Sequence, residues 1–347
     1  MMFKPKFTIT NKINNALLEI ERARGFLEAA ELKEEWIKEM QSRALILESH
    51  HSTHIEGTQL TLEQSERILT GKPAGEVRPD DRQELLNYRE AMDFVSKYLN
   101  EKSEITEELI REIHRTLVKE VRGGTLEPGG YRKVQNYVVN SLTGEVIYTP
   151  PPPEKVPALM KELVEWLNSE KDIHPVLVAG IAQYKFVEIH PFLDGNGRTA
   201  RVLCTLLLYK NGYDFKRLFS LSEFYDKDRR RYYEAIRSVK ENDMDLTRWL
   251  EYFVEGLKTQ MLEVKAKGEL AIKKEVVLEK AEKLDLNERQ LKAVRYVIER
   301  GKISISAFKS LVPEVSEKTL YRDLQDLVGR GLLKEVGEKK GRIYVLK

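Results

Sequence analysis

The segment VLVAGIAQYKFVEIHPFLDGNGRTAR, residues 176–201, decides how the rest of the sequence is interpreted. Residues 176–189 are almost continuously apolar, which predicts a buried helix. In the next twelve positions a histidine, an acid, two glycines, an asparagine and two arginines follow one another closely. We predict a second helix from about Gly197, with residues 194–197 as a tight loop at its amino terminus. Free backbone N–H groups and the helix dipole favour an anion there.

The charged residues of this loop indicate phosphate chemistry. Arg198 and Arg201 are three positions apart, so they share a helix face and present forked donors to phosphate oxygens. Asp194 suits Mg²⁺, which usually takes one or two carboxylates and completes its shell with phosphate oxygens and water. His190 is the nearby group that can accept a proton near neutral pH. A purely structural loop would not need these arginines at the positive end of a helix, so the set predicts phosphoryl or nucleotidyl transfer.

Length and composition set wider limits. The chain has 347 residues, of which 41% are hydrophobic, and its net charge is +2. These values predict a folded protein of two or three domains with no charge bias towards a particular partner. Its one cysteine, Cys204, lies in the apolar run VLCTLLLY, which indicates a packed thiol in a reducing compartment. We see no leader and no apolar run of about 20 residues, and therefore expect a cytoplasmic protein without a membrane span.

Most of the chain before residue 285 has helical apolar spacing. The predicted helices cover residues 12–48, 61–70, 82–100, 104–120, 154–168, 173–189, 198–211, 227–240 and 245–262. The interruption at 129–153 contains two β-rich runs, 134–139 and 146–149, around a Leu-Thr-Gly turn, which predicts a hairpin. The edges of a lone hairpin are either covered or accept another chain as an added strand.

The last 63 residues differ in charge from the rest. Residues 285–347 contain 14 Lys or Arg and 9 Asp or Glu. Their pattern predicts three helices followed by a basic hairpin, which resembles a winged helix-turn-helix whose recognition helix covers 316–330. Candidate groove contacts are Lys318, Thr319 and Arg322, and candidate phosphate contacts are Lys339, Lys340 and Arg342. Because Asp323 and Asp326 dilute the basic face, a protein-interaction or dimerisation module of the same shape is the alternative.

The motif HPFLDGNGRTAR resembles that of the Fic family, His-x-Phe-x-Asp/Glu-Gly-Asn-Gly-Arg-x-x-Arg, at every fixed position. Fic proteins similar to this chain transfer AMP from ATP to a hydroxyl of a target protein. The resemblance covers about residues 11–257. It implies a mainly α fold, a Fic-type helical bundle with a β-hairpin flap, to which the winged helix-turn-helix domain is added.

The resemblance also implies roles for individual residues. His190 would deprotonate the target hydroxyl, Asp194 would hold Mg²⁺, and Arg201 would take the γ-phosphate of ATP. The implied ligands of the α- and β-phosphates are Gly195, Asn196, Gly197 and Arg198. The implied target-docking edge of the flap is Val138, Val139 and Asn140. Tyr233 occupies the place where related proteins often set an aromatic ring against adenine.

A second motif lies in HSTHIEGTQLT. Ser52, Glu56 and Gly57 resemble the family's inhibitory motif, Ser/Thr-x-x-x-Glu-Gly/Asn. Ser52 and Glu56 share a helix face, and Gly57 is a natural stop for that helix. Glu56 could pair with Arg201 and withdraw it from the γ-phosphate. His50, His51 and His54 lack the glutamate of a His-Glu-x-x-His zinc motif, so we expect them to pack or to lie at the surface.

These inferences divide the chain into four parts: residues 1–80 with the inhibitory motif, a catalytic core at 81–257, a helical connector at 258–284, and a winged domain at 285–347. The favoured function is an autoinhibited protein adenylyltransferase that uses ATP and Mg²⁺. Two alternatives stay open: removal of AMP from a protein with the help of Glu56, and a DNA-binding regulator in which the Fic body senses nucleotide. The sequence names no target, which could be another protein or the chain itself, and leaves monomer and homodimer open.

Overall fold

The computed structural model describes residues 3–98, 104–121, 127–139, 144–213, 216–338 and 341–347. The chain forms two compact units. The first comprises Met1–Ala29 and Lys33–Val264, and the second comprises Lys265–Lys347 together with Ala30–Leu32. The long helix α11 (Thr247–Lys283) contains the boundary between them. None of the described helices has an apolar stretch long enough to cross a bilayer.

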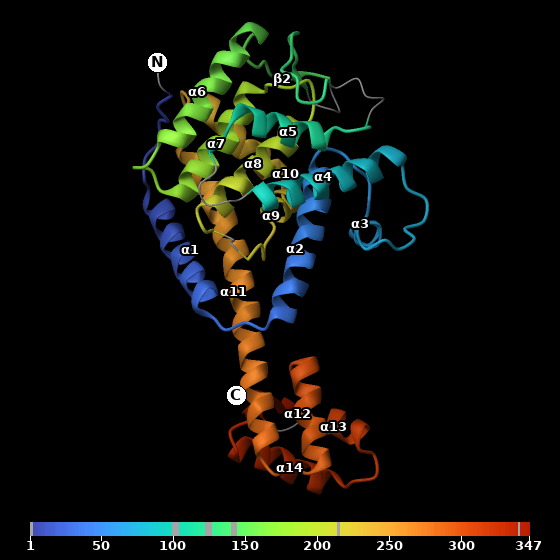
Figure 1. Ribbon diagram of the computed structural model, residues 1–347. Helices are drawn as coiled ribbons and strands as arrows, with labels where there is room; N and C mark the ends of the chain where they lie inside the picture. Colours follow the sequence, from blue (N-terminus) through green and yellow to red (C-terminus); the bar gives the residue numbers. More distant parts are fainter. Residues whose placement is uncertain (1–2, 99–103, 122–126, 140–143, 214–215, 339–340) are drawn as a thin grey trace. The chain divides into compact units, whose positions relative to one another are not determined.

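The first unit is mainly helical, as predicted (Figure 1). Before the hairpin it contains α1 (Asn11–Ala29), α2 (Glu34–Ile55), α3 (Leu62–Leu69), α4 (Pro79–Tyr98) and α5 (Glu107–Leu117). The hairpin strands are β1 (Val138–Val139) and β2 (Val146–Tyr148). After it come the short 3-10 helix η2 (Pro153–Lys155), α6 (Val156–Ser169), α7 (Pro175–Ile189), α8 (Asn196–Lys210), α9 (Leu221–Lys227), α10 (Arg229–Glu241) and α11.

Three predicted boundaries need correction. The single helix predicted at 12–48 is two helices, α1 and α2, because both bury apolar side chains in the same core and the chain must turn between them. The N-terminal region at 1–80 is not separate from the core at 81–257, since α2, α3 and α4 pack together around Leu60, Ile68 and Leu85. The connector at 258–284 is the continuation of α11.

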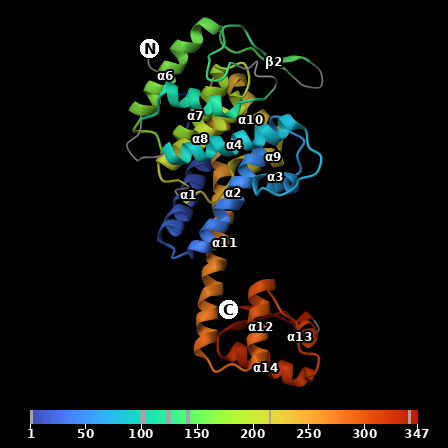
Figure 2. The same ribbon diagram turned by 45° about the vertical axis from the view of Figure 1, so that its right-hand side comes forward.

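Helices α7 and α8 pack side by side in the core of the first unit (Figures 1 and 2). Helix α7 is buried along most of its length, as its apolar sequence predicts. Gly180 lets α11 approach closely, because a Cβ atom there would lie 2.8 Å from the ring of Phe253. The indole N–H of Trp249 also donates to the Gly180 carbonyl oxygen at 2.7 Å. This packing fixes the helix that leads into the motif loop.

The β1–β2 hairpin is shorter than the sequence predicts. The strands are antiparallel, with Val138 opposite Tyr148 and Val139 opposite Val146. Residues 134–137 do not extend the ladder. Two of their side chains make other contacts: the Gln135 amide donates to the Pro150 carbonyl at 3.1 Å, and the Asn136 amide donates to the Phe192 carbonyl at 3.0 Å. The hairpin is thereby attached to the motif loop.

The second unit contains the three helices and the hairpin that the sequence predicts. They are α12 (Glu288–Arg300), α13 (Ile305–Leu311), α14 (Glu317–Gly329), β3 (Leu333–Val336) and β4 (Ile343–Leu346). Ser316 caps α14 by accepting from the Thr319 N–H, and Gly301 ends α12 in a left-handed conformation. The unit begins at Lys265 and not at 285, because Val277 and Ala281 of α11 pack into its core.

Candidate active site

The predicted loop is present between α7 and α8. Helix α7 ends at Ile189, and His190 adopts a left-handed conformation, with φ +50°. Helix α8 begins at Asn196, one residue earlier than predicted, after Gly195 with φ +74°. A side chain at Gly195 would also meet Val118, because its Cβ would lie 3.0 Å from a methyl group there. The glycine therefore serves both the turn and the close packing of the loop.

The side chain of Asn196 closes the loop from inside. Its Oδ1 accepts from the Phe192 N–H at 3.0 Å, and its Nδ2 donates to the Phe192 carbonyl at 2.9 Å. Asn196 is 2% exposed and Phe192 is fully buried. The Asn196 side chain therefore shapes the loop, and the phosphate contact implied for this residue stays a prediction.

His114, on α5, supports the loop and was not identified from the sequence. Its ring stacks on Phe192 with centroids 3.6 Å apart. Its Nδ1 accepts from the Gly129 N–H at 3.0 Å, which assigns the proton to Nε2, and Nε2 lies 3.0 Å from the carbonyl oxygen of Asp194. Burial lowers the pKa of His114 to about 4, so the ring is neutral. The signal in the sequence was a histidine on the apolar face of a predicted helix.

His190 is placed as a proton acceptor. Its Nδ1 lies 3.2 Å from the Val187 carbonyl oxygen, which assigns the proton to Nδ1 and leaves Nε2 as the basic nitrogen. Burial lowers the pKa of His190 below its ordinary value. The ring is therefore neutral at pH 7, as a general base must be.

Arg132 fastens the hairpin to the motif loop and was also missed in the sequence. Its side chain donates to the His190 carbonyl oxygen at 2.8 Å and to that of Val134 at 3.3 Å. Its backbone N–H donates to the Pro191 carbonyl at 2.9 Å. Arg132 is 2% exposed, so this attachment is internal.

Arg201 is bound by the second predicted motif. Its Nε donates to the Ser52 hydroxyl at 2.7 Å, and one terminal nitrogen donates to the Ser52 carbonyl at 2.9 Å and to Glu56 Oε1 at 2.7 Å. Arg201 is 3% exposed, whereas the Glu56 side chain is 24% exposed. Burial by itself would lower the pKa of Arg201, but the Glu56 carboxylate outweighs this effect and raises it. The predicted pair of Arg201 and Glu56 is confirmed as a contact.

Arg198 has a different environment from the one predicted. Its side chain is fully buried and donates to Glu84 Oε2 at 2.7 Å, while Asp194 Oδ2 lies 3.4 Å away. Arg198 therefore does not face solvent beside Arg201 as a second open phosphate donor. Glu84, on α4, was not singled out in the sequence, where it looks like an ordinary helical glutamate.

Glu56 and Glu84 line the same cavity, although they lie on different helices. Its volume is about 520 Å³. The lining residues are Glu56, Gly57, Thr58, Arg78, Pro79, Asp80, Asp81 and Glu84. The two glutamates that hold Arg201 and Arg198 therefore line one cavity.

Comparison with known proteins agrees with this geometry. Residues 104–208 match the Fic/DOC family. The chain contains a Fic/DOC domain. The domain includes His114, Arg132 and the whole motif loop, whereas Ser52, Glu56 and Glu84 come from helices that precede it. The site is thus completed by residues outside the Fic domain.

The chain is also similar to curated proteins and to solved structures. "Protein adenylyltransferase Fic" of Drosophila grimshawi is 35% identical over 200 residues, which are 57% of this chain and 40% of the relative. The chain thus spans about two fifths of the length of that relative. A Fic family protein from Desulfovibrio desulfuricans G20 has a TM-score of 0.65 at 22% identity and covers 99% of this chain and 98% of its own. Residues 134–508 of Fic-1 from C. elegans have a TM-score of 0.60 at 26% identity, over 72% of this chain and 70% of that one.

The other residues predicted near the Fic domain fall into two groups. Tyr233 is 43% exposed beside the buried Tyr232, so its ring is accessible at the surface. Val139 is 49% exposed and Val138 is half-buried, whereas Asn140 lies outside the described residues. The docking edge of the flap is therefore seen at two of its three predicted positions.

The histidines before Glu56 attach α2 to the α9–α10 corner. His51 Nδ1 and His54 Nδ1 lie 2.7 and 2.8 Å from the same oxygen of Asp226. Arg229 also pairs with Asp226. Within the described part of the chain, no group of three or more His, Cys, Asp or Glu residues is arranged to hold a metal ion. The expected structural role of these histidines agrees with these contacts.

In the second unit the predicted nucleic-acid contacts are only partly described. Lys318 and Arg322 are exposed and Thr319 is half-buried on α14, whereas Lys339 and Lys340 lie outside the described residues. Arg342 pairs with Glu335 at 2.8 Å.

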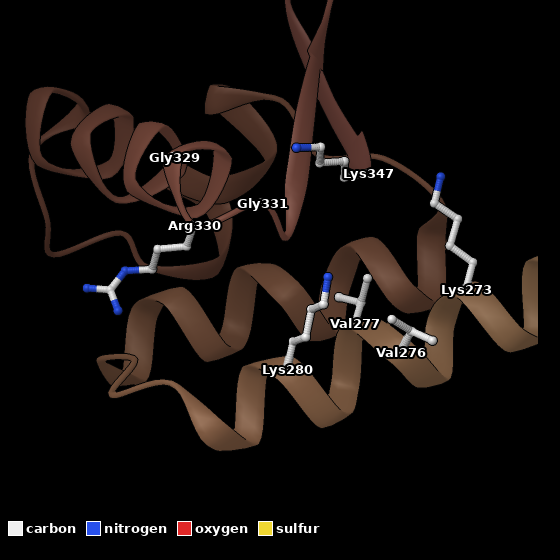
Figure 3. Close-up of a pocket in the computed structure, with 8 residues that line it drawn as sticks. All are labelled: Lys273, Val276, Val277, Lys280, Gly329, Arg330, Gly331 and Lys347. Carbon is white, nitrogen blue, oxygen red and sulfur yellow. The ribbon is translucent and has the colours of Figure 1, made fainter.

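Two further features of α14 bear on its surface charge. Asp323 and Asp326 are paired with Arg289 and Arg330, each at 2.7 Å, so they dilute the basic face less than the sequence suggested. A cavity of about 570 Å³ lies near the carboxyl end of α14 and displays Lys273, Lys280 and Lys347 (Figure 3). It contains none of the predicted nucleic-acid contacts.

Proposed function

We propose that this protein transfers AMP from ATP to a side-chain hydroxyl of a protein. The hydroxyl oxygen bonds to the α-phosphorus, the bond from that phosphorus to the α,β-bridging oxygen breaks, and pyrophosphate leaves. His190 Nε2 accepts the hydroxyl proton. The observation that carries this proposal is the motif loop, which places a neutral histidine at one end and the amino terminus of α8, with Arg201, at the other. The curated relatives named protein adenylyltransferase support it.

Mg²⁺ fits the site as an ion shared between protein and substrate. The Asp194 side chain is 25% exposed at the loop and is the carboxylate of the motif. One carboxylate with substrate phosphates and water is a usual Mg²⁺ shell. Asp194 would hold the ion, which when bound would neutralise charge that develops on the phosphates. The loop backbone at Gly195 and Gly197 would receive the α- and β-phosphates at the helix terminus.

We further propose that Glu56 restrains this reaction. Arg201 would have to contact the γ-phosphate, but its donors are directed at Ser52 and Glu56. A buried arginine that already has a carboxylate gains less from a phosphate, and ATP held without it would lie wrongly for in-line attack. The restraint is released when Glu56 moves or is replaced.

Labelled ATP tests the reaction type. The Glu56→Gly protein is incubated with Mg²⁺ and ATP that carries the label at either the α- or the γ-phosphate. We expect label on the protein from α-labelled ATP and none from γ-labelled ATP. Label from the γ-position would show phosphotransfer and contradict the proposal.

One observation also favours removal of AMP as a second activity. Glu56 Oε1 contacts Arg201, while no partner of Oε2 occurs among the described residues, and the side chain is partly exposed. A partly exposed carboxylate oxygen can position a water. If this activity exists, release of AMP from a modified protein depends on Glu56 and is lost in Glu56→Gln.

For the second unit we propose nucleic-acid binding through α14, in the manner of a winged helix-turn-helix. The exposed Lys318 and Arg322, and the pairing of Asp323 with Arg289 of α12, support it. Binding of duplex DNA by the full chain should weaken as salt rises and should be lost in Lys318→Ala with Arg322→Ala. DNA binding that does not depend on salt, or that persists in the double variant, would contradict the proposal.

A further inference from the structure

Glu84 has a specific relationship to the motif loop. It accepts from Arg198 at 2.7 Å, and the two side chains are 4% and 0% exposed. The other end of the same guanidinium lies 3.4 Å from Asp194, whose side chain is 25% exposed. The Arg198 guanidinium therefore lies between two carboxylates, close to the buried Glu84 and farther from the partly exposed Asp194.

The distances from Arg198 to the two carboxylates show that Arg198 is paired mainly with Glu84. A charge-assisted hydrogen bond is strong at 2.7–2.9 Å and weak at 3.4 Å. If Glu84 were neutral, the buried Arg198 would lose its main partner, and Asp194 would be the nearby anion able to replace it. Asp194 would then be drawn into a close ion pair with Arg198 and would bind a cation less well.

We propose that Glu84 is a positioning residue that keeps Arg198 from a close ion pair with Asp194, so that the Asp194 carboxylate can bind the divalent cation. This inference rests on the proposed function, because it assumes that Asp194 holds Mg²⁺ beside ATP. Arg198 then acts inside the protein, between Glu84 and Asp194. The inference assigns Glu84 a role opposite to that of Glu56, which holds Arg201 in a restrained state.

A competing role for Glu84 predicts a different effect of Glu84→Gln on ATP affinity. If Glu84 withheld Arg198 from the nucleotide phosphates, as Glu56 is proposed to withhold Arg201, its neutralisation would free Arg198 and tighten ATP binding without Mg²⁺. If Glu84 keeps Arg198 from a close ion pair with Asp194, neutralisation of Glu84 weakens the Mg²⁺-dependent part of ATP binding and leaves the Mg²⁺-free part unchanged.

Calorimetric titration of ATP in EDTA and in excess MgCl₂ separates these roles. The full chain is used with Glu56→Gly and His190→Ala, which removes the restraint and prevents turnover during the titration. We expect Glu84→Gln to reduce the Mg²⁺-dependent gain in ATP affinity by about tenfold, the lower end of the range for residues that orient metal ligands. ATP affinity in EDTA should stay within about twofold, since no direct phosphate contact is removed.

Two further variants control the experiment. Asp80→Asn removes the same charge from an exposed position on the same helix and in the same cavity, so it should leave both affinities unchanged. Glu84→Gln with Arg198→Gln removes the cation together with its partner. This double variant should regain the Mg²⁺-dependent gain that Glu84→Gln loses, and it also avoids the buried unpaired charge that could prevent Glu84→Gln from folding.

The outcomes are distinct. Tighter ATP binding in EDTA for Glu84→Gln, or an unchanged Mg²⁺-dependent gain, overturns the role of Glu84. Loss of ATP affinity in EDTA for the double variant overturns it as well, because Arg198 would then contact phosphate directly. Failure of AMP transfer in the Glu56→Gly protein, with the calorimetric pattern intact, would reject the proposed function and leave the role of Glu84 standing.

Discussion

A Cβ atom on Gly197 would lie 2.2 Å from Oε1 of Glu56. The same atom would lie 3.2 Å from a terminal nitrogen of Arg201. The second glycine of the motif therefore leaves the space in which the Glu56 carboxylate meets Arg201. The catalytic and the inhibitory motifs fit together at this residue.

This relationship predicts a coupling between positions 56 and 197. Gly197→Ala should lower the free energy of unfolding by about 1–3 kcal/mol, because the new methyl group overpacks the site. In the Glu56→Gly background the cost should be smaller by at least about 0.5 kcal/mol. Denaturant unfolding of the unaltered chain, the two single variants and the double variant measures this coupling as a double-mutant cycle. Additive effects would show that Glu56 does not occupy this space.

The partly buried His190 predicts the pH dependence of AMP transfer. Burial lowers the pKa of His190 below 6.5, so the neutral ring predominates at pH 7. The ring becomes protonated, and is lost as a base, only at lower pH. The rate of AMP transfer by Glu56→Gly, at saturating ATP and Mg²⁺, should reach half of its maximum at a pH below 6.5 and should not fall between pH 7.5 and 8. A rate that is already half-maximal above pH 6.5 would contradict the placement of His190.

His114 predicts a contribution of the loop to acid stability. The ring titrates near 6.5 in the unfolded chain and near 4 in the folded one. Between these values the unfolded chain binds more protons, so stability is lost as the pH falls from 6.5 to 4, by about 3 kcal/mol for this group.

The variant His114→Phe keeps a ring against Phe192 but leaves the Gly129 N–H and the Asp194 carbonyl without their partner. It should be less stable by about 1–3 kcal/mol at pH 7.5, with a shallower loss on acidification. His50, whose pKa burial also lowers to about 4, should retain its own contribution. An unchanged acid slope would contradict the assignment to His114.

Two glycines in helices predict opposite changes of stability. Gly180→Ala would place a methyl group 2.8 Å from the Phe253 ring, and it should cost about 1–3 kcal/mol. Gly25→Ala, in α1, meets no atom within 4 Å and should stabilise the protein by about 0.5–1 kcal/mol through helix propensity. Thermal unfolding compares them. A neutral Gly180→Ala would mean that α7 and α11 pack less closely.

The sequence predicted the parts of this site that have a local pattern. His190, Asp194 and Arg201 belong to one local motif. The spacing of Ser52 and Glu56 predicted a shared helix face; in the structure Glu56 caps the end of α2, and both residues contact Arg201. The helix–loop–helix followed from an apolar run and two glycines. In the second unit, caps and alternating runs predicted three helices and a hairpin correctly.

Residues that act through long-range contacts could not be identified in this way. Glu84, His114 and Arg132 lie at least 58 positions from their partners in the motif loop, and each resembles an ordinary residue of its segment. The division of residues 12–48 into two helices depends on a core that both helices share, which no local pattern reveals. Arg198 illustrates the same limit, since its burial against Glu84 is decided by α4.

The most direct test of the central claim is the intact mass of three proteins incubated with ATP and Mg²⁺: the unaltered chain, Glu56→Gly, and Glu56→Gly with His190→Ala. The account predicts an added AMP on Glu56→Gly, little or none on the unaltered chain, and none on the double variant. An added AMP that persists without His190, or one that appears equally on the unaltered chain, would contradict the proposed base or the proposed restraint. No added AMP on any of the three would contradict self-modification as a product of the released site.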